Sequence, residues 1–362
     1  MPIFTSRPAL RWLAPLAFVL AISGTTLVAT NATAERKLPT RTAEQLLVDV
    51  QQARVDGLSG TVIQRADLGI PEIPGADQSS DLGSLVSGTH TLRVRYSEPN
   101  KARLAVLGTY GETNVITNGT DLWVWNSREQ AATHRTLDAG SRPDELDRKP
   151  GDLPRTPQEA AEQVLAALEP TTTVTTDSDV TVADRAAYEL VLDPNDDASL
   201  IGQIRLAVDG ETKMPLRVQI LNAQADLVFE VGYDSVSFTR PEDREFEFKA
   251  PPGTKVTEGD AVKPRTPSEK EQEQARENLD QARDSAEIVG SGWSTVAIQQ
   301  IGTPDGSEPS ELQGFLSQLP QVSGDWGKGR LLAGTAFSAV LTDDGRLAIG
   351  AVRPEKLYQA LG

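Results

Sequence analysis

Residues 89–126 read THTLRVRYSEPNKARLAVLGTYGETNVITNGTDLWVWN, and the rest of the fold is inferred outward from this stretch. From Thr89 to Tyr96 apolar and polar side chains alternate, which is the period of a half-buried β-strand. Glu98-Pro99-Asn100 is typical of a turn, and Asn118-Gly119 is a strong hairpin signal. Because connections this short join only antiparallel neighbours, the stretch predicts an antiparallel meander.

The same alternation continues along the chain in two meanders. Beyond Thr89–Tyr96, strands are predicted at Leu58–Gln64, Arg103–Gly108, Glu112–Thr117, Asp121–Asn126 and His134–Leu137, and then at Tyr188–Leu192, Gly202–Val208, Leu216–Leu221, Leu227–Tyr233 and Val236–Thr239. Asp209-Gly210 is expected to close one of the later hairpins. A sheet of about ten antiparallel strands tends to curl or close on itself.

Two amphipathic helices accompany the strands. The first begins at Thr42, where Gln45 completes a capping box, and the second begins at Thr156 and ends at Pro170. We expect both helices to pack their apolar faces on the inner side of the curved sheet. They are too few to cover all of it, so the remainder is a candidate apolar groove.

The C-terminal third is predicted to be separate. Residues 257–287 are read as a linker that carries a strongly charged helix from Ser268. Residues 288–362 are read as a small α+β domain. Its strands are expected at Trp293–Gln300, Gly334–Thr342 and Arg346–Val352, and its helices at Ser310–Leu319 and Pro354–Leu361.

The N-terminus has the features of an export signal. Arg7 and Arg11 precede an apolar run from Trp12 to Val28, and Ala32-Thr33-Ala34 is a small-residue cleavage pattern. Residues 1–34 are therefore predicted to be a secretory signal cleaved after Ala34, with an uncleaved N-terminal membrane anchor as the alternative. Either reading places the remaining chain outside the cytoplasm, secreted or in the cell envelope.

Composition excludes several functions. The 35 Lys and Arg against 52 Asp and Glu give a net charge of −17, which argues against nucleic-acid binding because that needs a basic surface. The chain contains no cysteine, so it has no disulfide, no thiol nucleophile and no iron–sulfur ligand set of cysteines. Lys101, Arg103 and Arg205 are read as solvated charges on the outer face.

The sequence lacks the patterns that usually carry catalysis. His90 and His134, its two histidines, do not have the spacing of a zinc site. Neither a Gly-x-Ser-x-Gly elbow nor a Walker motif occurs. Asp193–Asp197 resembles the start of a calcium loop, but Ala198 stands where glycine is needed and Ile204 where glutamate is needed. The prediction is a protein without catalysis, metal or cofactor.

Several segments together resemble the outer-membrane lipoprotein carrier (LolA) superfamily. They are Tyr96–Arg103 with Asn118–Trp125, then Tyr188–Pro194 with Ile204–Asp209 and Met214–Leu216, and finally Phe246–Val256. They match the family's strand-Pro-Arg turn, its Asn-Gly-x-x-Leu-Trp hairpin and its final Phe-x-Phe-x-x-Pro-x-Gly strand. The resemblance implies that residues 38–256 form an unclosed half-barrel, an α+β fold with helices on the concave face of a highly curved antiparallel sheet.

The resemblance also implies a function. Carriers of this family hold the acyl chains of lipoproteins, so a lipid acyl chain or a lipoprotein is the expected partner. Alternation then predicts the residues of the groove: Leu92, Val94, Tyr96, Leu104, Val106, Trp123, Trp125, Ile204, Leu206, Val208, Phe229 and Val231. The competing interpretation of each residue is ordinary core packing against the helices.

The two-domain layout leaves a second function open. It is similar to the RseB/MucB branch, whose members regulate sigma factors by binding an anti-sigma factor. This resemblance implies a partner of a different kind, the extracytoplasmic part of a single-span membrane protein. A purely structural envelope protein, which would bind neither, is the third reading.

Overall fold

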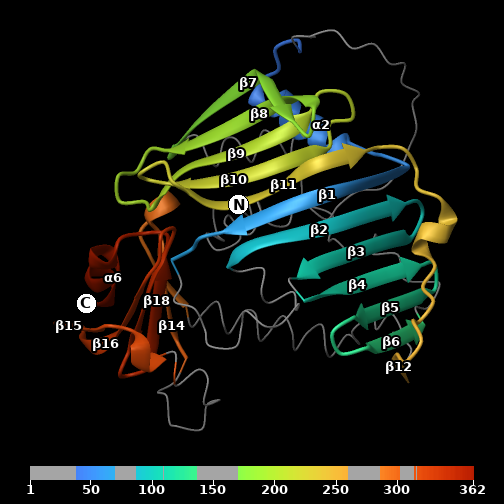
Figure 1. Ribbon diagram of the computed structural model, residues 1–362. Helices are drawn as coiled ribbons and strands as arrows, with labels where there is room; N and C mark the ends of the chain where they lie inside the picture. Colours follow the sequence, from blue (N-terminus) through green and yellow to red (C-terminus); the bar gives the residue numbers. More distant parts are fainter. Residues whose placement is uncertain are drawn as a thin grey trace, which may run out of the picture.

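The computed structural model describes residues 38–69, 87–108, 110–136, 170–259, 286–301, 314 and 316–362. These residues form one sheet of twelve strands and a second sheet of six (Figure 1). The export signal with Ala34, the helix from Thr156 and the charged helix from Ser268 lie outside the described residues. Among the helices that are described, none has both the length and the apolar character needed to cross a membrane.

The larger sheet confirms the curved antiparallel architecture. Its strands are β1 (Gly57–Ala66), β2 (Gly88–Ser97), β3 (Lys101–Gly108), β4 (Gly111–Asn118), β5 (Asp121–Asn126), β6 (Ala131–Thr136), β7 (Thr172–Val182), β8 (Arg185–Pro194), β9 (Ile201–Asp209), β10 (Pro215–Asn222), β11 (Leu227–Ser237) and β12 (Lys255–Glu258). Their order across the sheet is β12-β6-β5-β4-β3-β2-β1-β11-β10-β9-β8-β7. β12 runs parallel to β6, whereas the other neighbouring pairs are antiparallel.

Strand β1 joins the two halves of this sheet. It pairs with β2 along its whole length and with β11 on its other side. A β-bulge interrupts the β1–β11 register at Thr61 and Val62. Gly60 is required at this point, because a Cβ there would lie 2.5 Å from the Ser235 carbonyl oxygen and 2.8 Å from the ring of Tyr233. The absence of a side chain at Gly60 thus leaves room for the ring of Tyr233 next to the bulge.

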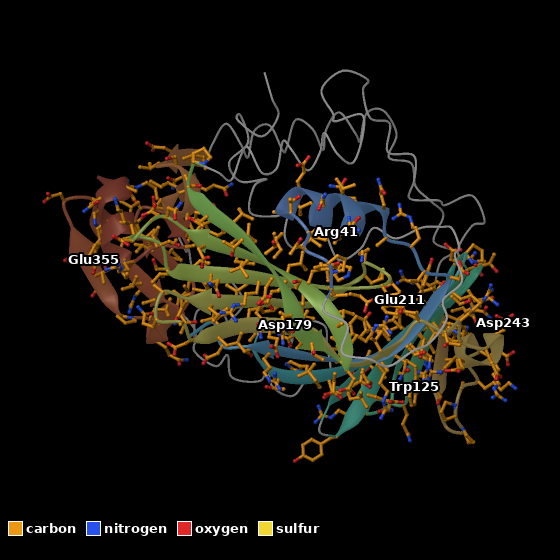
Figure 2. All side chains as sticks on the ribbon, turned by 90° about the horizontal axis from the view of Figure 1, so that it is seen from above. Arg41, Trp125, Asp179, Glu211, Asp243 and Glu355 are labelled. Carbon is orange, nitrogen blue, oxygen red and sulfur yellow. The ribbon has the colours of Figure 1, made fainter. Side chains whose placement is uncertain are left out.

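Helix α2 (Ala43–Gln52) lies inside the curve of the sheet (Figure 2). Its predicted capping box is confirmed: Thr42 Oγ1 accepts from the Gln45 amide at 3.2 Å, and Gln45 Oε1 accepts from the Thr42 amide at 3.1 Å. Leu46, Leu47 and Val50 form its buried face. Each such side chain contributes about 1.5–3 kcal/mol when it is fully buried.

Three parts of the larger sheet differ from the sequence prediction. β7 was not predicted, because its threonines and aspartates show little apolar alternation. The two strands expected at Leu227–Tyr233 and Val236–Thr239 form one strand, β11. The final strand that the resemblance implies within Phe246–Val256 begins later than expected: η3 (Asp243–Phe246) is a 3₁₀-helix, and the chain pairs only from Lys255, as β12.

The smaller sheet contains β13 (Ala286–Val289), β14 (Val296–Gln300), β15 (Gln321–Gly324), β16 (Gly327–Ala333), β17 (Ser338–Thr342) and β18 (Arg346–Gly350), in the order β13-β14-β18-β17-β16-β15. The hairpin β15–β16 was not predicted. The terminal helix α6 (Pro354–Leu361) is confirmed and packs on one face of the sheet. Val340, Ala348 and Leu357 are completely buried between them.

The two sheets share a hydrophobic cluster. Ile201, Ile204 and Val228 of the larger sheet pack with Trp293 and Ala336 of the C-terminal unit. Backbone hydrogen bonds cross the same boundary from Leu200 to Ala351 at 2.8 Å and from Thr335 to Leu68 at 3.0 Å. Trp293 Nε1 also donates to Thr172 Oγ1 at 2.8 Å, and both residues are buried. The C-terminal unit is therefore docked through a core.

The buried Trp293–Thr172 hydrogen bond gives a first prediction. Thr172→Val keeps the side-chain shape but leaves the buried indole nitrogen without this acceptor, so we expect the free energy of unfolding to fall by about 1–3 kcal/mol. Urea denaturation followed by circular dichroism measures the change.

Thr175→Val is the matched control, because Thr175 lies exposed on the same strand. It should change stability by no more than about 0.5 kcal/mol. Equal effects of the two substitutions would show that the hydrogen bond does not stabilise the docked arrangement.

Candidate functional site

The concave face of the first half of the sheet is built from apolar cross-strand pairs. Leu92 of β2 stands opposite Val62 on one side and Val106 on the other. One step along, Val94 stands opposite Leu104. Leu92 and Val106 are buried, whereas Val94 and Leu104 remain half-buried. This part of the face is apolar and incompletely covered by the described residues.

The second half of the sheet continues the apolar face. Across β9, β10 and β11, Val218 stands opposite Leu206 and Val231, and Ile220 stands opposite Ile204 and Phe229. Leu206 packs with Leu47 of α2, so helix α2 covers this region. Ile204 packs in the hydrophobic cluster that the larger sheet shares with the C-terminal unit.

Ten of the twelve predicted groove residues therefore share the concave face. They are Leu92, Val94, Tyr96, Leu104, Val106, Ile204, Leu206, Val208, Phe229 and Val231. Leu92, Val106, Ile204 and Val208 are buried, and the remaining six are half-buried. Val94, Leu104 and Val231 also pack on the cluster around Leu92 and Val106, so that region combines a rigid floor with partly open apolar side chains.

Trp123 and Trp125 do not lie with these ten residues. Val115 stands opposite Leu104 on β3 and opposite Val124 on β5, which puts Val124 on the concave face and both tryptophans on the convex face. Shifting the pairing of a strand by one residue moves all of its side chains to the opposite face of the sheet. The face of the two tryptophans is therefore set by the pairing registers of three successive hairpins. Alternation within a single strand does not contain that information.

The tryptophans lie beneath a segment that we name the strap, residues 238–258. It follows β11, includes η3, and ends by pairing β12 with the outer edge of β6. Phe248 of the strap lies 5.0 Å from the Trp123 ring and 6.0 Å from the Trp125 ring, measured between centroids. Phe246 is buried. Figure 2 shows Asp243 of the strap on the outer side of the sheet, away from α2.

Basic side chains of the convex face hold the strap in place. Arg95 forms an ion pair with Glu245, and Lys101 Nζ lies 2.8 Å from Asp243 Oδ1. Arg103 Nη1 donates to the Glu245 carbonyl oxygen at 3.2 Å. Lys101 and Arg103 were expected to be solvated, and this is wrong because the strap covers them. The strap has no periodic pattern of apolar residues from which it could be predicted. The one feature of its sequence that indicates packing is the pair Phe246 and Phe248, which stand among charged residues.

His134 fastens the end of the strap. Its Nε2 lies 2.8 Å from Asp121 Oδ1 and its Nδ1 lies 2.8 Å from Glu258 Oε2. The ring stacks on Trp123 with centroids 4.2 Å apart. The hydrogen bond to Asp121 and the contact with Glu258 raise the pKa of His134 above its usual value, against the effect of burial. These two contacts link β6 to β5 and to β12, and the protonated form of the ring can donate to both carboxylates.

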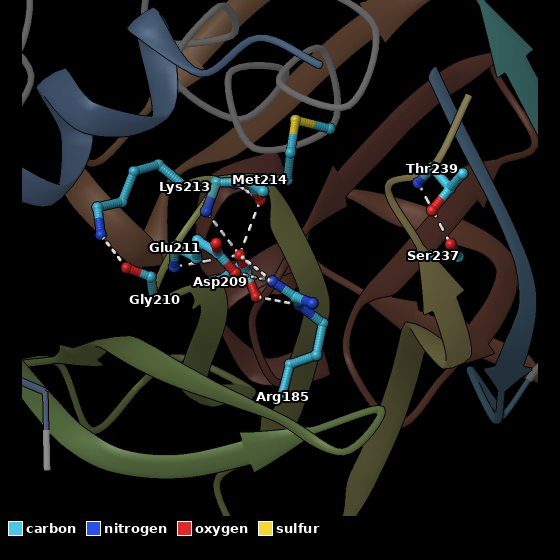
Figure 3. Close-up of polar contacts among 9 residues, drawn as sticks. Arg185, Asp209, Gly210, Glu211, Lys213, Met214, Ser237 and Thr239 are labelled. Carbon is cyan, nitrogen blue, oxygen red and sulfur yellow. Dashed lines mark hydrogen bonds and ion pairs between the residues drawn. The ribbon is translucent and has the colours of Figure 1, made fainter. Parts of the chain in front are cut away.

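A buried carboxylate in the β9–β10 turn proves to be structural (Figure 3). Asp209 accepts from Arg185 Nη2 at 3.0 Å, from the Thr212 amide at 2.7 Å and from the Thr212 hydroxyl at 2.8 Å. Burial tends to raise its pKa, but these donors outweigh burial and lower it. Its hydrogen-bonding capacity is used in closing the predicted hairpin, so it is a poor candidate for acid–base chemistry.

The part of the chain that the structure describes contains no group of three or more histidine, cysteine, aspartate or glutamate side chains arranged to hold a metal ion. Asp193 of the rejected calcium loop accepts a hydrogen bond from Gln203 instead. The candidate sites are therefore the apolar concave face and the polar convex face with its strap.

Comparison with known proteins found similarity at the level of solved structures. Neither a protein-family model nor a curated protein matches the chain. The chain is similar to the MucA/MucB complex of Pseudomonas aeruginosa, with 12% identity, a TM-score of 0.39, and coverage of 88% of this chain and 94% of that one.

Two further solved structures are similar to a smaller share of the chain. A LolA superfamily protein from Nitrosomonas europaea has 14% identity and a TM-score of 0.23, covering 58% of this chain and 99% of that one. An uncharacterized conserved protein from Thermus thermophilus has 10% identity and a TM-score of 0.34, covering 60% and 100%. At these identities and TM-scores the likeness is one of fold, and no function is transferred from it.

The His134 contacts predict that the strap depends on pH. A group whose pKa is raised on folding adds stability that is fully present below its unfolded value of 6.5 and is lost as pH rises through the folded value. Stability should therefore decrease from pH 6 to pH 8 in wild type, and His134→Gln should remove this part of the decrease. Urea denaturation at the two pH values measures it.

His90→Gln is the control, since it removes the other histidine at a position away from the strap. It should leave the decrease in place. If His134→Gln and wild type lose the same stability over this pH range, the proposed link between β6 and β12 does not operate.

Proposed function

We propose that this chain is an exported, non-catalytic protein that holds a lipid acyl chain against the concave face of its half-barrel. The observation that carries the proposal is the group of half-buried apolar side chains around β2, β3 and β11, represented by Val94, Leu104 and Val231. Their floor is the buried cluster of Val62, Leu92 and Val106.

The chemistry of this region suits a hydrocarbon ligand. Its floor and walls are aliphatic, and an alkyl chain gains about 0.8 kcal/mol for each methylene group that it removes from water. Polar recognition is not needed for such a ligand, because the hydrophobic effect is non-directional. A groove with a rigid floor and partly exposed walls can admit acyl chains of different lengths.

The resemblance of the sequence to lipoprotein carriers supports the same ligand class. The segments that carry it, such as Tyr96–Arg103 and Asn118–Trp125, form the β2–β3 and β4–β5 hairpins of the half-barrel. Export rests on the pattern of residues 1–34, and cleavage after Ala34 is part of the proposal. A carrier or sensor of lipoproteins in the cell envelope would combine these features.

Native mass spectrometry tests the acyl-chain proposal. The protein purified from a membrane-containing host should carry additional mass in the range of a lipid, and organic solvent should release it. A ligand-free mass that persists after incubation with a lipid extract would contradict the proposal.

Two leucines on the same strand provide a matched pair of variants. Leu104 faces the concave side, whereas Leu107 stands opposite Glu112 and Thr91 on the convex side. Leu104→Asn should weaken lipid binding about tenfold or more, because it places an amide in the groove. Leu107→Asn should leave binding unchanged. Equal loss in both variants would show that the effect comes from stability and not from the groove.

A second candidate function is the binding of a membrane protein, and the smaller sheet favours it. On the face opposite α6, an apolar row runs across four strands through Ile288, Ala297, Ile349 and Ala339. Ile288 is 36% exposed and Ile349 is 40% exposed. We infer that this row could receive the extracytoplasmic segment of a single-span membrane protein, which is the alternative regulatory role.

Crosslinking in membranes tests the second candidate. The full chain should capture one membrane protein, and Ile349→Asn should lose it while lipid binding persists. Ile301→Asn is the control, because Ile301 is 53% exposed and lies beyond the end of β14, outside the row. Capture that is unaffected by Ile349→Asn would exclude this surface. Removal of the whole C-terminal unit is a poorer test, since it uncovers Ile201 and Ile204.

A further inference from the structure

A cavity of about 340 Å³ lies on the convex face, on the opposite side of the sheet from the acyl-chain groove. Strands β2, β3 and β4 form its floor, and Glu245 of the strap forms one side. Its lining residues are Arg93, Arg95, Arg103, Ala105, Glu112, Asn114 and Glu245. Three arginines and a buried asparagine thus converge from adjacent strands.

The cavity is lined by one buried donor that has no partner among the described residues. Asn114 is 1% exposed, and its Oδ1 accepts from Arg103 Nε at 3.1 Å. This contact fixes the orientation of the amide, and Asn114 Nδ2 then has no hydrogen-bond partner among the described residues. A buried donor without an acceptor costs about 1–3 kcal/mol.

Arg103 is a cation held by neutral acceptors. Its two hydrogen bonds go to the Asn114 side-chain oxygen and to the Glu245 backbone carbonyl oxygen. No described carboxylate lies within ion-pair distance of its guanidinium, whereas Arg95 is paired with Glu245. Burial, and then the neighbouring charge of Arg95, lower the pKa of Arg103, and the opposing effects of Glu112 and Glu245 do not cancel this. The guanidinium of Arg103 therefore has no charged hydrogen-bond partner among the described residues, and an anion could bind to it.

The charge balance of the lining agrees with this. Three arginines against Glu112 and Glu245 give a formal charge of 3 − 2 = +1. The whole chain carries −17, so this is a local reversal of sign. Guanidinium groups match the oxygens of a phosphate in geometry and can each donate two parallel hydrogen bonds.

We propose that the convex cavity of Arg93, Arg103 and Asn114 binds a phosphate group. Phosphate would give Asn114 Nδ2 the acceptor that it lacks among the described residues and would give Arg103 a charged partner, and its charge of about −1.5 to −2 exceeds that of a carboxylate. An adjacent cavity of about 370 Å³ shares Arg93 and Arg95 and is lined by the hydroxyl-bearing residues Ser59, Thr61, Ser235 and Ser237. It has room for the polar alcohol part of a phosphate ester.

Calorimetric titration of the full chain with inorganic phosphate at low ionic strength tests the site. We expect saturable binding that weakens with added salt. Arg103→Gln and Arg93→Gln should each reduce affinity about tenfold or more, because a charge-assisted hydrogen bond is lost. Absence of saturable binding, or equal affinity in wild type and Arg103→Gln, would overturn the proposal.

Two further variants separate binding from folding. Glu112→Gln removes a negative charge from the lining and should tighten phosphate binding, an increase that loss of structure cannot produce. Arg244→Gln removes an equal positive charge from the strap outside the cavity, where Arg244 is exposed and pairs with Glu242, and should leave affinity unchanged. Weaker binding in Glu112→Gln, or equal loss in Arg244→Gln and Arg103→Gln, would refute a specific site.

A vesicle arm identifies the source of the phosphate. Phosphatidic acid vesicles that retain wild type but not Arg103→Gln, with no retention by phosphatidylcholine vesicles, would assign a lipid headgroup. Binding of inorganic phosphate without vesicle retention would assign a soluble phosphate ester. Either result, together with saturable binding of inorganic phosphate, supports the phosphate site, and absence of saturable phosphate binding overturns it whatever the vesicles show. The acyl-chain proposal concerns the concave face, where Leu104 lies, so Leu104→Asn does not bear on this test.

Discussion

The pairing of β1 with β2 on one side and with β11 on the other is the constraint on which the remaining structure depends. It joins two meanders that are distant in sequence into one sheet, and the bulge at Thr61 and Val62 introduces local bending where they meet. The curvature gives α2 a concave surface to cover and leaves a convex surface for the strap. Both candidate binding surfaces follow from a single strand in the middle of the sheet.

The two faces of this sheet carry different chemistry because their residues alternate along the same strands. On β3, Leu104 belongs to the apolar concave face, and its neighbour Arg103 lines the convex cavity. A substitution that shifted the register by one residue would exchange these surfaces and place arginine among aliphatic side chains. Because a shifted register would place the wrong side chains on both faces, it costs more free energy than it would in a sheet with one buried face. The pairing register is therefore more strongly specified here.

Local patterns were sufficient to predict much of this fold. The alternation at Thr89–Tyr96, the Asn118-Gly119 turn with Gly119 at φ 75°, and the Thr42 capping box all appear as expected, because each depends on residues close in sequence. Long-range relations were not predictable in the same way. The face on which Trp123 and Trp125 lie depends on the pairing registers of three successive hairpins. The burial of Arg103 depends on the strap, whose Glu245 is 142 residues further along the chain. β7 could not be predicted because its threonine and aspartate residues do not produce an alternation of apolar and polar side chains.

The edges of the larger sheet, β12 and β7, have a consequence for behaviour at high concentration. β12 has four residues, all exposed, and carries Lys255 and Glu258. β7 is longer, but its register is broken between Asp177 and Val180. Short, charged or interrupted edges are poor templates for strand addition by another molecule. Pairing of this twelve-stranded sheet with a second molecule through its edge strands is therefore disfavoured.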